Sequence, residues 1–187
     1  MANKDAAFGL RAIGKVGQNR DNQGLSEYSI GASSTAIFQN DPVMMAATGK
    51  IVVGTAAAVL LGSLNGVFFT DANTSKPTYA NHLKGSNTAT DIVGFVSDDP
   101  YERFEIQSDA ALAVADVGLN ADIVYAAGAS PNFISKVELD HSDLKTATAQ
   151  LRVLGISKDI ENNEAGSANV NLVVMINEHF LKGTVGI

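Results

Sequence analysis

Hydrophobic and polar residues alternate along this chain in short runs that are separated by turn-forming residues. The alternation is clearest at 102–109 and at 168–180, where Val170, Leu172 and Val174 fall on one face. Successive side chains of a β-strand point to opposite faces of its sheet, so a period of two predicts a half-buried strand. Both segments are therefore predicted to be strands.

Other strands are predicted between clusters of Gly, Pro, Asn and Asp, which favour turns. They are expected at 27–38, 43–47, 50–54, 65–71, 91–99, 121–127, 132–140 and 147–159. Many short strands with turn signals between them are typical of a sandwich or a barrel. The sequence therefore predicts an all-β fold, either an antiparallel β-sandwich or a β-barrel.

The connections between these strands carry their own signals. Asp99-Pro100 predicts a hairpin that joins 91–99 to 102–109, and residues 162–167 predict a second hairpin turn. Residues 71–90 form a long polar loop, of a length that is often functional. Residues 110–118 are expected to be the one short helix, while 56–62 fit a helical turn or a buried strand equally well.

Two parts of the chain are distinguished by their patterns: an N-terminal arm at 1–26 and a β-rich domain at 27–187. The arm has no sustained period but carries the apolar residues Phe8, Leu10, Ile13 and Val16, which are costly to leave in water. Either the arm packs on its own domain, or it packs on a neighbouring subunit. Deletion of residues 2–24 is expected to leave the domain folded and to weaken assembly.

Composition excludes several classes of function. Of 187 residues 45% are hydrophobic, so a core can be buried, and the net charge of −7 with no run of Lys or Arg opposes binding to nucleic acid or an anionic membrane. The absence of Cys excludes thiol chemistry and disulfides. The longest apolar run, 55–62, is far shorter than the ~20 residues of a membrane span. A soluble protein made in a cytoplasm is expected.

Three segments approach known binding motifs but depart from them. Residues 9–16 resemble a phosphate-binding loop, but Val16 replaces the Ser or Thr that holds magnesium. Residues 71–82 begin like a calcium loop, yet Lys76 and His82 occupy the positions of its Gly and its bidentate Glu. The segments at 71–75 and 159–163 are better interpreted as turns that use Asp and Ser side chains. No cofactor and no metal site is predicted.

Titratable residues give no constellation typical of a catalytic site. His82, His141 and His179 lie far apart, and a structural role is expected for His179 at the end of the last strand. The acidic residues between 98 and 102 are expected at a solvated hairpin tip, near Arg103 or a basic partner. We therefore expect no enzyme.

Taken together, these segments resemble virion structural proteins of tailed bacteriophages, in particular capsid decoration, or cement, proteins. The resemblance rests on MANKDAAFGLRAIG at the start, on IFQNDPV (37–43), GVFFTD (66–71), IVGFVSDDPYERFEIQSD (92–109) and ADVGLNADIV (115–124), and on QLRVLGISKDIENN and VMINEHF near the end. In this family a Gly often precedes the Asp of the I-F-x-x-D turn. Here the position is Asn40, which also tolerates a left-handed backbone.

The resemblance implies a β-barrel or β-sandwich on the outer surface of the head, bound to the major capsid protein and assembled as a homo-oligomer, with a trimer favoured. It implies no catalytic residues. Candidate contacts with subunits or the capsid come from the arm and the polar loop: Phe8, Leu10, Ile13, Val16, Lys76, Tyr79 and His82. The alternatives are another virion component (a tail, head–tail or major capsid protein), or a small-ligand-binding β-barrel or an enzyme.

Overall fold

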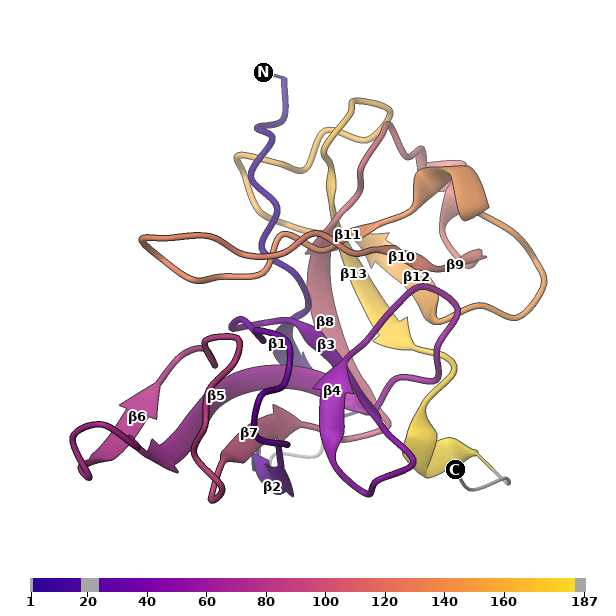
Figure 1. Cartoon of the computed structure of the whole chain (residues 1–187). Helices are drawn as coiled ribbons and strands as arrows, with labels where there is room; N and C mark the ends of the chain where they lie inside the picture. The colour runs from indigo at the N-terminus through magenta and orange to yellow at the C-terminus, as the bar shows by residue number, and fades with distance from the viewer. Residues whose placement is uncertain (1, 18–23, 184–187) are drawn as a thin grey trace.

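The computed structural model describes residues 2–17 and 24–183, and these form an antiparallel β-sandwich that does not close into a barrel. One sheet, called sheet A here, has the order β1-β8-β13-β12-β9 (Figure 1). Its strands are β1 (Arg11–Lys15), β8 (Glu102–Gln107), β13 (Asn171–Ile176), β12 (Leu151–Ile156) and β9 (Asn120–Ala121). The all-β class predicted from the alternation is confirmed.

The other sheet, sheet B, has the order β2-β7-β5-β3-β4, with β6 paired to the far end of β5. Its strands are β2 (Ser26–Ser29), β7 (Val93–Ser97), β5 (Gly62–Thr70), β3 (Pro42–Met45), β4 (Ile51–Val53) and β6 (Pro77–Ala80). A separate pair, β10 (Ile123–Val124) and β11 (Glu138–Leu139), lies beside sheet A. All of these pairings are antiparallel.

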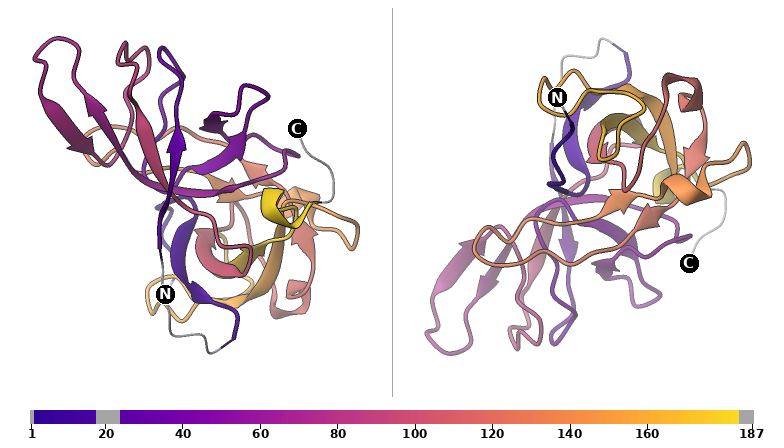
Figure 2. Two further views of the ribbon diagram at one scale, coloured as in Figure 1. Left: turned by 90° about the horizontal axis from the view of Figure 1, so that it is seen from below. Right: turned by 90° about the horizontal axis from the view of Figure 1, so that it is seen from above.

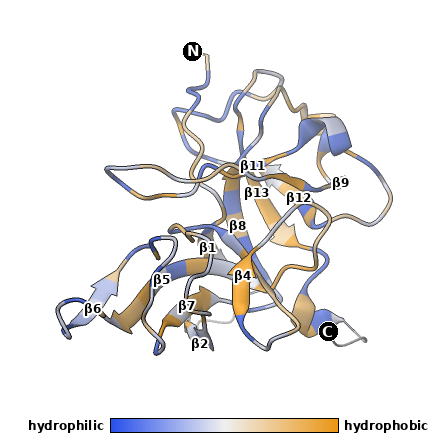
Figure 3. Cartoon of the chain, viewed as in Figure 1, coloured by the Kyte–Doolittle hydropathy of each residue, from blue (hydrophilic) through white to orange (hydrophobic). Residues whose placement is uncertain are grey.

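Each sheet has its own cluster of buried aliphatic side chains, and the strands carry most of the hydrophobic positions (Figure 3). Phe104 and Leu172 lie in the cluster of sheet A, and Val67 and Val96 in that of sheet B. Leu60 comes directly before β5 of sheet B but packs into the cluster of sheet A. The body is therefore built from two adjoining cores rather than one.

The expected hairpin at Asp99-Pro100 is wrong. Strand β7 pairs with β2 and β5 in sheet B, whereas β8 pairs with β1 and β13 in sheet A. The turn therefore carries the chain from one sheet to the other. A turn signal predicts a change of direction but does not specify the pairing partner of the strand that follows, so the sequence alone suggested the nearest one.

Other expected elements are shorter than predicted. Residues 110–118 contain only a single turn of 3-10 helix, η1 (Val114–Asp116), and Leu112 just before it is buried in the core of sheet A. The strand expected at 132–140 is reduced to β11, and the preceding loop extends away from the body on the same side as β6 (Figure 1). The polar loop at 71–90 contains β6, which forms a hairpin with β5 that projects from the body (Figure 2).

The described part of the predicted arm, residues 2–17 and 24–26, packs on its own domain. Asn3 and Lys4 bond to the loop between β12 and β13, where the Asn162 amide accepts from the Lys4 N–H at 2.9 Å and donates to its carbonyl at 2.8 Å. The buried Gln107 amide accepts from the Ala6 N–H at 2.9 Å. Of the two alternatives for the arm, packing within the domain is therefore the one observed for these residues.

Candidate functional site

The predicted contact residues of the arm fall into two environments. Leu10 is completely buried in the core of sheet A, so its prediction as a contact residue is wrong. Phe8 is half-buried, and the Arg11 guanidinium lies 4.6 Å from the centre of its ring. Ile13 and Val16 are 43% and 49% exposed on β1 and just after it.

Ile13 and Val16 share one end of the molecule with the turn between β7 and β8. Ile13 is the extra residue of a β-bulge, and the Val16 N–H donates to the Tyr101 carbonyl at 2.9 Å. Tyr101 is 59% exposed, and the Lys182 ammonium lies 4.7 Å from its ring centre. We call Ile13, Val16 and Tyr101 the β1 patch. It is an exposed apolar surface at an outermost strand of sheet A.

The acidic residues beside this patch do not form the expected solvated hairpin tip. Asp99 pairs with Lys15 at 2.5 Å, and this contact lowers the pKa of Asp99 and raises that of Lys15. Asp98 accepts hydrogen bonds from the Ser26 and Tyr28 hydroxyls at 2.9 and 2.6 Å. Glu102 is buried, and burial raises its pKa. Lys15 and the Ser26 and Tyr28 hydroxyls therefore hold Asp99 and Asp98 within the fold.

His179 has the structural role predicted for it. Its Nδ1 accepts from the Leu181 N–H at 3.1 Å, and its burial lowers the pKa to about 4, so the ring is neutral at neutral pH. The turn predicted at 71–75 is also confirmed, since Asp71 accepts from the Asn73 and Thr74 N–H groups at 2.9 and 2.8 Å.

The predicted contacts of the polar loop lie on and beside the projecting hairpin. Lys76 is exposed in the hairpin turn, and Tyr79 is 76% exposed on β6. His82 is half-buried and stacks on Phe133 with ring centres 3.9 Å apart. Burial lowers the pKa of His82. The stack holds the loop before β11 against the end of β6, where Asn81 also donates to the Asn132 carbonyl at 2.9 Å.

The sequence did not reveal the surface around Tyr79. The registers place Phe68 opposite Tyr79, and Phe95 opposite Gly66, on the face of sheet B that points away from its core. The Tyr79 ring lies 4.7 Å from that of Phe68 and 6.2 Å from that of Phe95. We call these three rings the aromatic platform. The available signal was the run Val67-Phe68-Phe69, because consecutive residues of a strand cannot all face one core.

A shallow, widely open groove of about 390 Å³ lies beside the aromatic platform. It is lined by Gln39, Asn65, Gly66, Val67, Tyr79, Ala80, Asn81 and Phe95. A neighbouring groove of about 350 Å³ shares Gln39 and Asn65 and continues toward Phe8 and Arg11. No charged side chain lines the groove at the platform, although the chain carries a net charge of −7.

A buried polar cluster at Asn40 and Asp41 lies inside the molecule, where the two sheets meet. The completely buried Asp41 accepts from the Phe38 N–H at 2.8 Å through Oδ2, while its Oδ1 has no partner among the described residues. Burial raises the pKa of Asp41 to about 6. Next to it, Asn40 accepts from the Leu10 N–H at 2.9 Å, so the segment before β1 meets the turn before β3 here.

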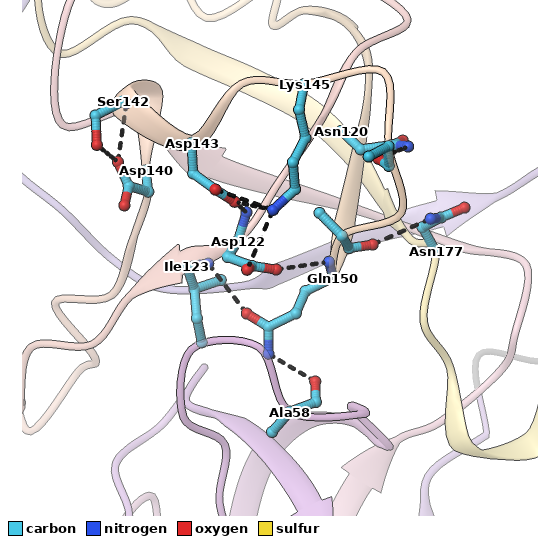
Figure 4. Close-up of polar contacts among 12 residues, drawn as sticks. Ala58, Asn120, Asp122, Ile123, Asp140, Ser142, Asp143, Lys145, Gln150 and Asn177 are labelled. Atoms are coloured by element: carbon cyan, nitrogen blue, oxygen red, sulfur yellow. Dashed lines mark hydrogen bonds and ion pairs between the residues drawn. The ribbon is translucent and has the colours of Figure 1, made fainter.

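A polar network surrounds Gln150 and Lys145 (Figure 4). Lys145 contacts Asp143 at 2.8 Å and Asp122 at 3.7 Å, and its contact lowers the pKa of Asp143. The buried Gln150 amide accepts from the Ile123 N–H at 3.1 Å and donates to the Ala58 carbonyl at 2.7 Å. Each of these side chains is paired or hydrogen-bonded to a neighbouring group, which indicates a structural network.

Among the residues that the structure describes, no group of three or more His, Asp or Glu residues is arranged to hold a metal ion. None of the described helices is long and apolar enough to cross a membrane. Comparisons of the chain with protein-family models, with curated proteins and with solved structures found no match.

Proposed function

We propose that this protein is a structural component of a tailed-phage virion, a capsid decoration protein that binds the outside of the head and bridges capsid subunits. The observation that carries the proposal is the β1 patch, in which Ile13 and Val16 are 43% and 49% exposed on and just after an outermost strand, and Val16 is bonded to the exposed Tyr101. Apolar residues exposed at neighbouring positions are typical of an interaction surface. The family resemblance of the sequence segments supports the same function.

The β1 patch is held in place by contacts with the rest of the fold, as expected of a preorganised binding surface. The segment before β1 is anchored through Gln107 and Asn162, and the Lys15–Asp99 pair fixes the end of β1. A preformed surface loses little conformational entropy when it binds. Repeated weak contacts around a shell then add up through multivalency.

Cosedimentation of the purified protein with empty phage heads tests this proposal. We expect saturable binding at many copies per head, and light scattering of the free protein should reveal the expected homo-oligomer. A few copies per head would favour the alternative of a tail or head–tail component. Absence of binding would refute a virion role and favour a small-ligand binder or an enzyme.

Variants locate the contact. The double substitution Ile13→Ser with Val16→Ser should weaken head binding by at least about tenfold, as expected when central apolar contacts are removed. Both residues are exposed, so the fold should be retained, which circular dichroism can check. The matched control is Ile160→Ser, an apolar residue that is 87% exposed in the loop between β12 and β13 and lies outside the candidate contacts. Equal loss in both variants would exclude the β1 patch as the specific contact.

A further inference from the structure

The aromatic platform and its groove form a second surface whose chemistry differs from that of the β1 patch. Tyr79 is 76% exposed, and its ring is within 16° of parallel to that of Phe95. Exposed apolar rings that lie together are typical of a binding surface. The Tyr79 ring, next to those of Phe68 and Phe95, is the most exposed part of this platform.

A β-bulge places a polar side chain at the edge of this surface. The register of β5 against β7 shifts between Leu64 and Gly66, so Asn65 is the extra residue. Bulges redirect side chains and occur often beside functional sites. Asn65 is exposed, and none of the hydrogen bonds among the described residues uses its side chain. Its amide therefore offers both a donor and an acceptor to a ligand.

The neighbouring groups extend this polar rim. Gln39 Oε1 accepts from the Asn81 amide at 3.3 Å, which leaves the Gln39 amide N–H groups directed elsewhere. Gly66 lies between Asn65 and the rings, and a Cβ there would come within 3.1 Å of the Ala80 carbonyl oxygen. The absence of a side chain at Gly66 keeps the floor of the groove low. Glycine in a strand often marks such a close approach.

We propose that this groove binds a neutral oligosaccharide. A pyranose ring has an apolar face of C–H groups, which can stack on the exposed ring of Tyr79, and a rim of hydroxyl groups, which fits the amides of Asn65 and Gln39. Small-molecule sites typically combine apolar and aromatic lining with a few polar groups in this way. The uncharged lining favours a neutral ligand, because an ionised one would lose hydration without a counter-charge.

This inference goes beyond the proposed head binding. Tyr79, which the sequence offered as a candidate capsid contact, is here proposed to contact the oligosaccharide. The test is isothermal titration calorimetry of the full chain with chitohexaose, cellohexaose and maltohexaose as neutral probes, and with a heparin hexasaccharide as the anionic probe. We expect saturable binding of at least one neutral probe and none of heparin. Binding of no neutral probe at millimolar concentration, or binding of heparin alone, overturns the proposal.

Substitutions tie any binding to the groove. Tyr79→Ala should weaken it by at least about tenfold, a loss typical of a central aromatic contact. Asn65→Leu should weaken it while preserving the platform. Tyr101→Ala, an exposed tyrosine of the β1 patch, is the matched control and should bind normally. Unchanged binding by Tyr79→Ala contradicts the site. Cosedimentation of the wild-type protein with empty heads, measured in parallel, distinguishes failure of the sugar site from failure of the virion role.

Discussion

At the scale of single residues, the positions with unusual backbone or burial hold the junction between the two sheets. Asn40 has φ of 66°, so the left-handed conformation expected for this turn is confirmed. Gly9 has φ of 73°, and a Cβ there would lie 2.4 Å from the Asn40 carbonyl oxygen. The adjoining Asp41 is buried with one carboxyl oxygen unpartnered. The backbone conformation of Gly9 and Asn40 and the burial of the Asp41 carboxyl group are thus both constrained at the junction of the two sheets.

Asp41 predicts a pH dependence of stability. Its pKa is raised to about 6 in the fold from an ordinary value of 3.8, so the folded state binds the proton more tightly than the unfolded chain. This contribution is fully present below pH 3.8 and is lost as the pH rises through 6. Across that range the loss should approach about 3 kcal/mol, from 1.36 kcal/mol per pKa unit.

The measurement is urea unfolding of the wild type and of Asp41→Asn at several pH values between 4 and 8, a range chosen to bracket the pKa of about 6. The variant lacks the titrating group, so the free-energy difference between the two proteins should change with pH in the direction given above. A difference that is constant across this range would show that Asp41 does not titrate in the fold.

At the scale of elements, the burial of a strand depends more on the segments that pair with it and pack on it than on its own hydrophobic pattern. The alternation of β8 predicted a half-buried strand, yet Glu105 and Gln107 are 5% and 0% exposed on its polar face. Glu105 is covered by contacts with Arg11 of β1 and with Ser157, and Gln107 by the N-terminal segment. The polar face of β8 is thus buried at Glu105 and Gln107, because another part of the chain supplies hydrogen bonds there, while Arg103 on the same face stays exposed.

The N-terminal segment should consequently be required for stability. Leu10→Ala removes a completely buried side chain from the core of sheet A, and such substitutions cost about 2–5 kcal/mol. Val16→Ala is the control, with an expected effect within about 0.5 kcal/mol for an exposed position. Chemical denaturation of both variants gives the comparison. Equal, small effects would indicate that the segment is dispensable.

The packing of the N-terminal segment changes the result expected for the deletion of residues 2–24. The sequence predicted that the domain would fold without them, but the deletion removes both Leu10 and β1. We now expect it to lower stability severely. Point variants of Ile13 and Val16 are therefore the appropriate test of head binding.

At the scale of the whole molecule, the two cores are joined by a few buried polar links. Gln150, at the start of β12, donates to the Thr55 and Ala58 carbonyls in the connection between β4 and β5 at 2.8 and 2.7 Å. Leu60 and His179 form a further bridge between that connection and the chain after β13. These links make the sheets one body, with the β1 patch on one sheet and the aromatic platform on the other.

Removal of the Gln150 amide should weaken this coupling. Gln150→Ala removes the side-chain partner of the Ile123 N–H and of the Ala58 carbonyl, while the Thr55 carbonyl still accepts from the Ala58 N–H. Each unsatisfied buried group costs about 1–3 kcal/mol. We expect a large loss of stability and less protection of amide hydrogens at 55–58 in hydrogen exchange. Asn177→Ala is the control, because its amide serves the Ala149 carbonyl alone. Unchanged protection at 55–58 would contradict the tethering role.

The β-rich class, most strand positions, the left-handed turn at Asn40 and the Asp71 turn could be read from the amino-acid order alone. These features depend on local factors, namely the period of two and the conformational preferences of turn residues. The three-dimensional packing was needed to show that β7 and β8 belong to different sheets, that Leu10 is core, and that Phe68, Tyr79 and Phe95 meet beside Asn65. Strand pairing and burial depend on contacts between residues distant in sequence, which no local pattern specifies.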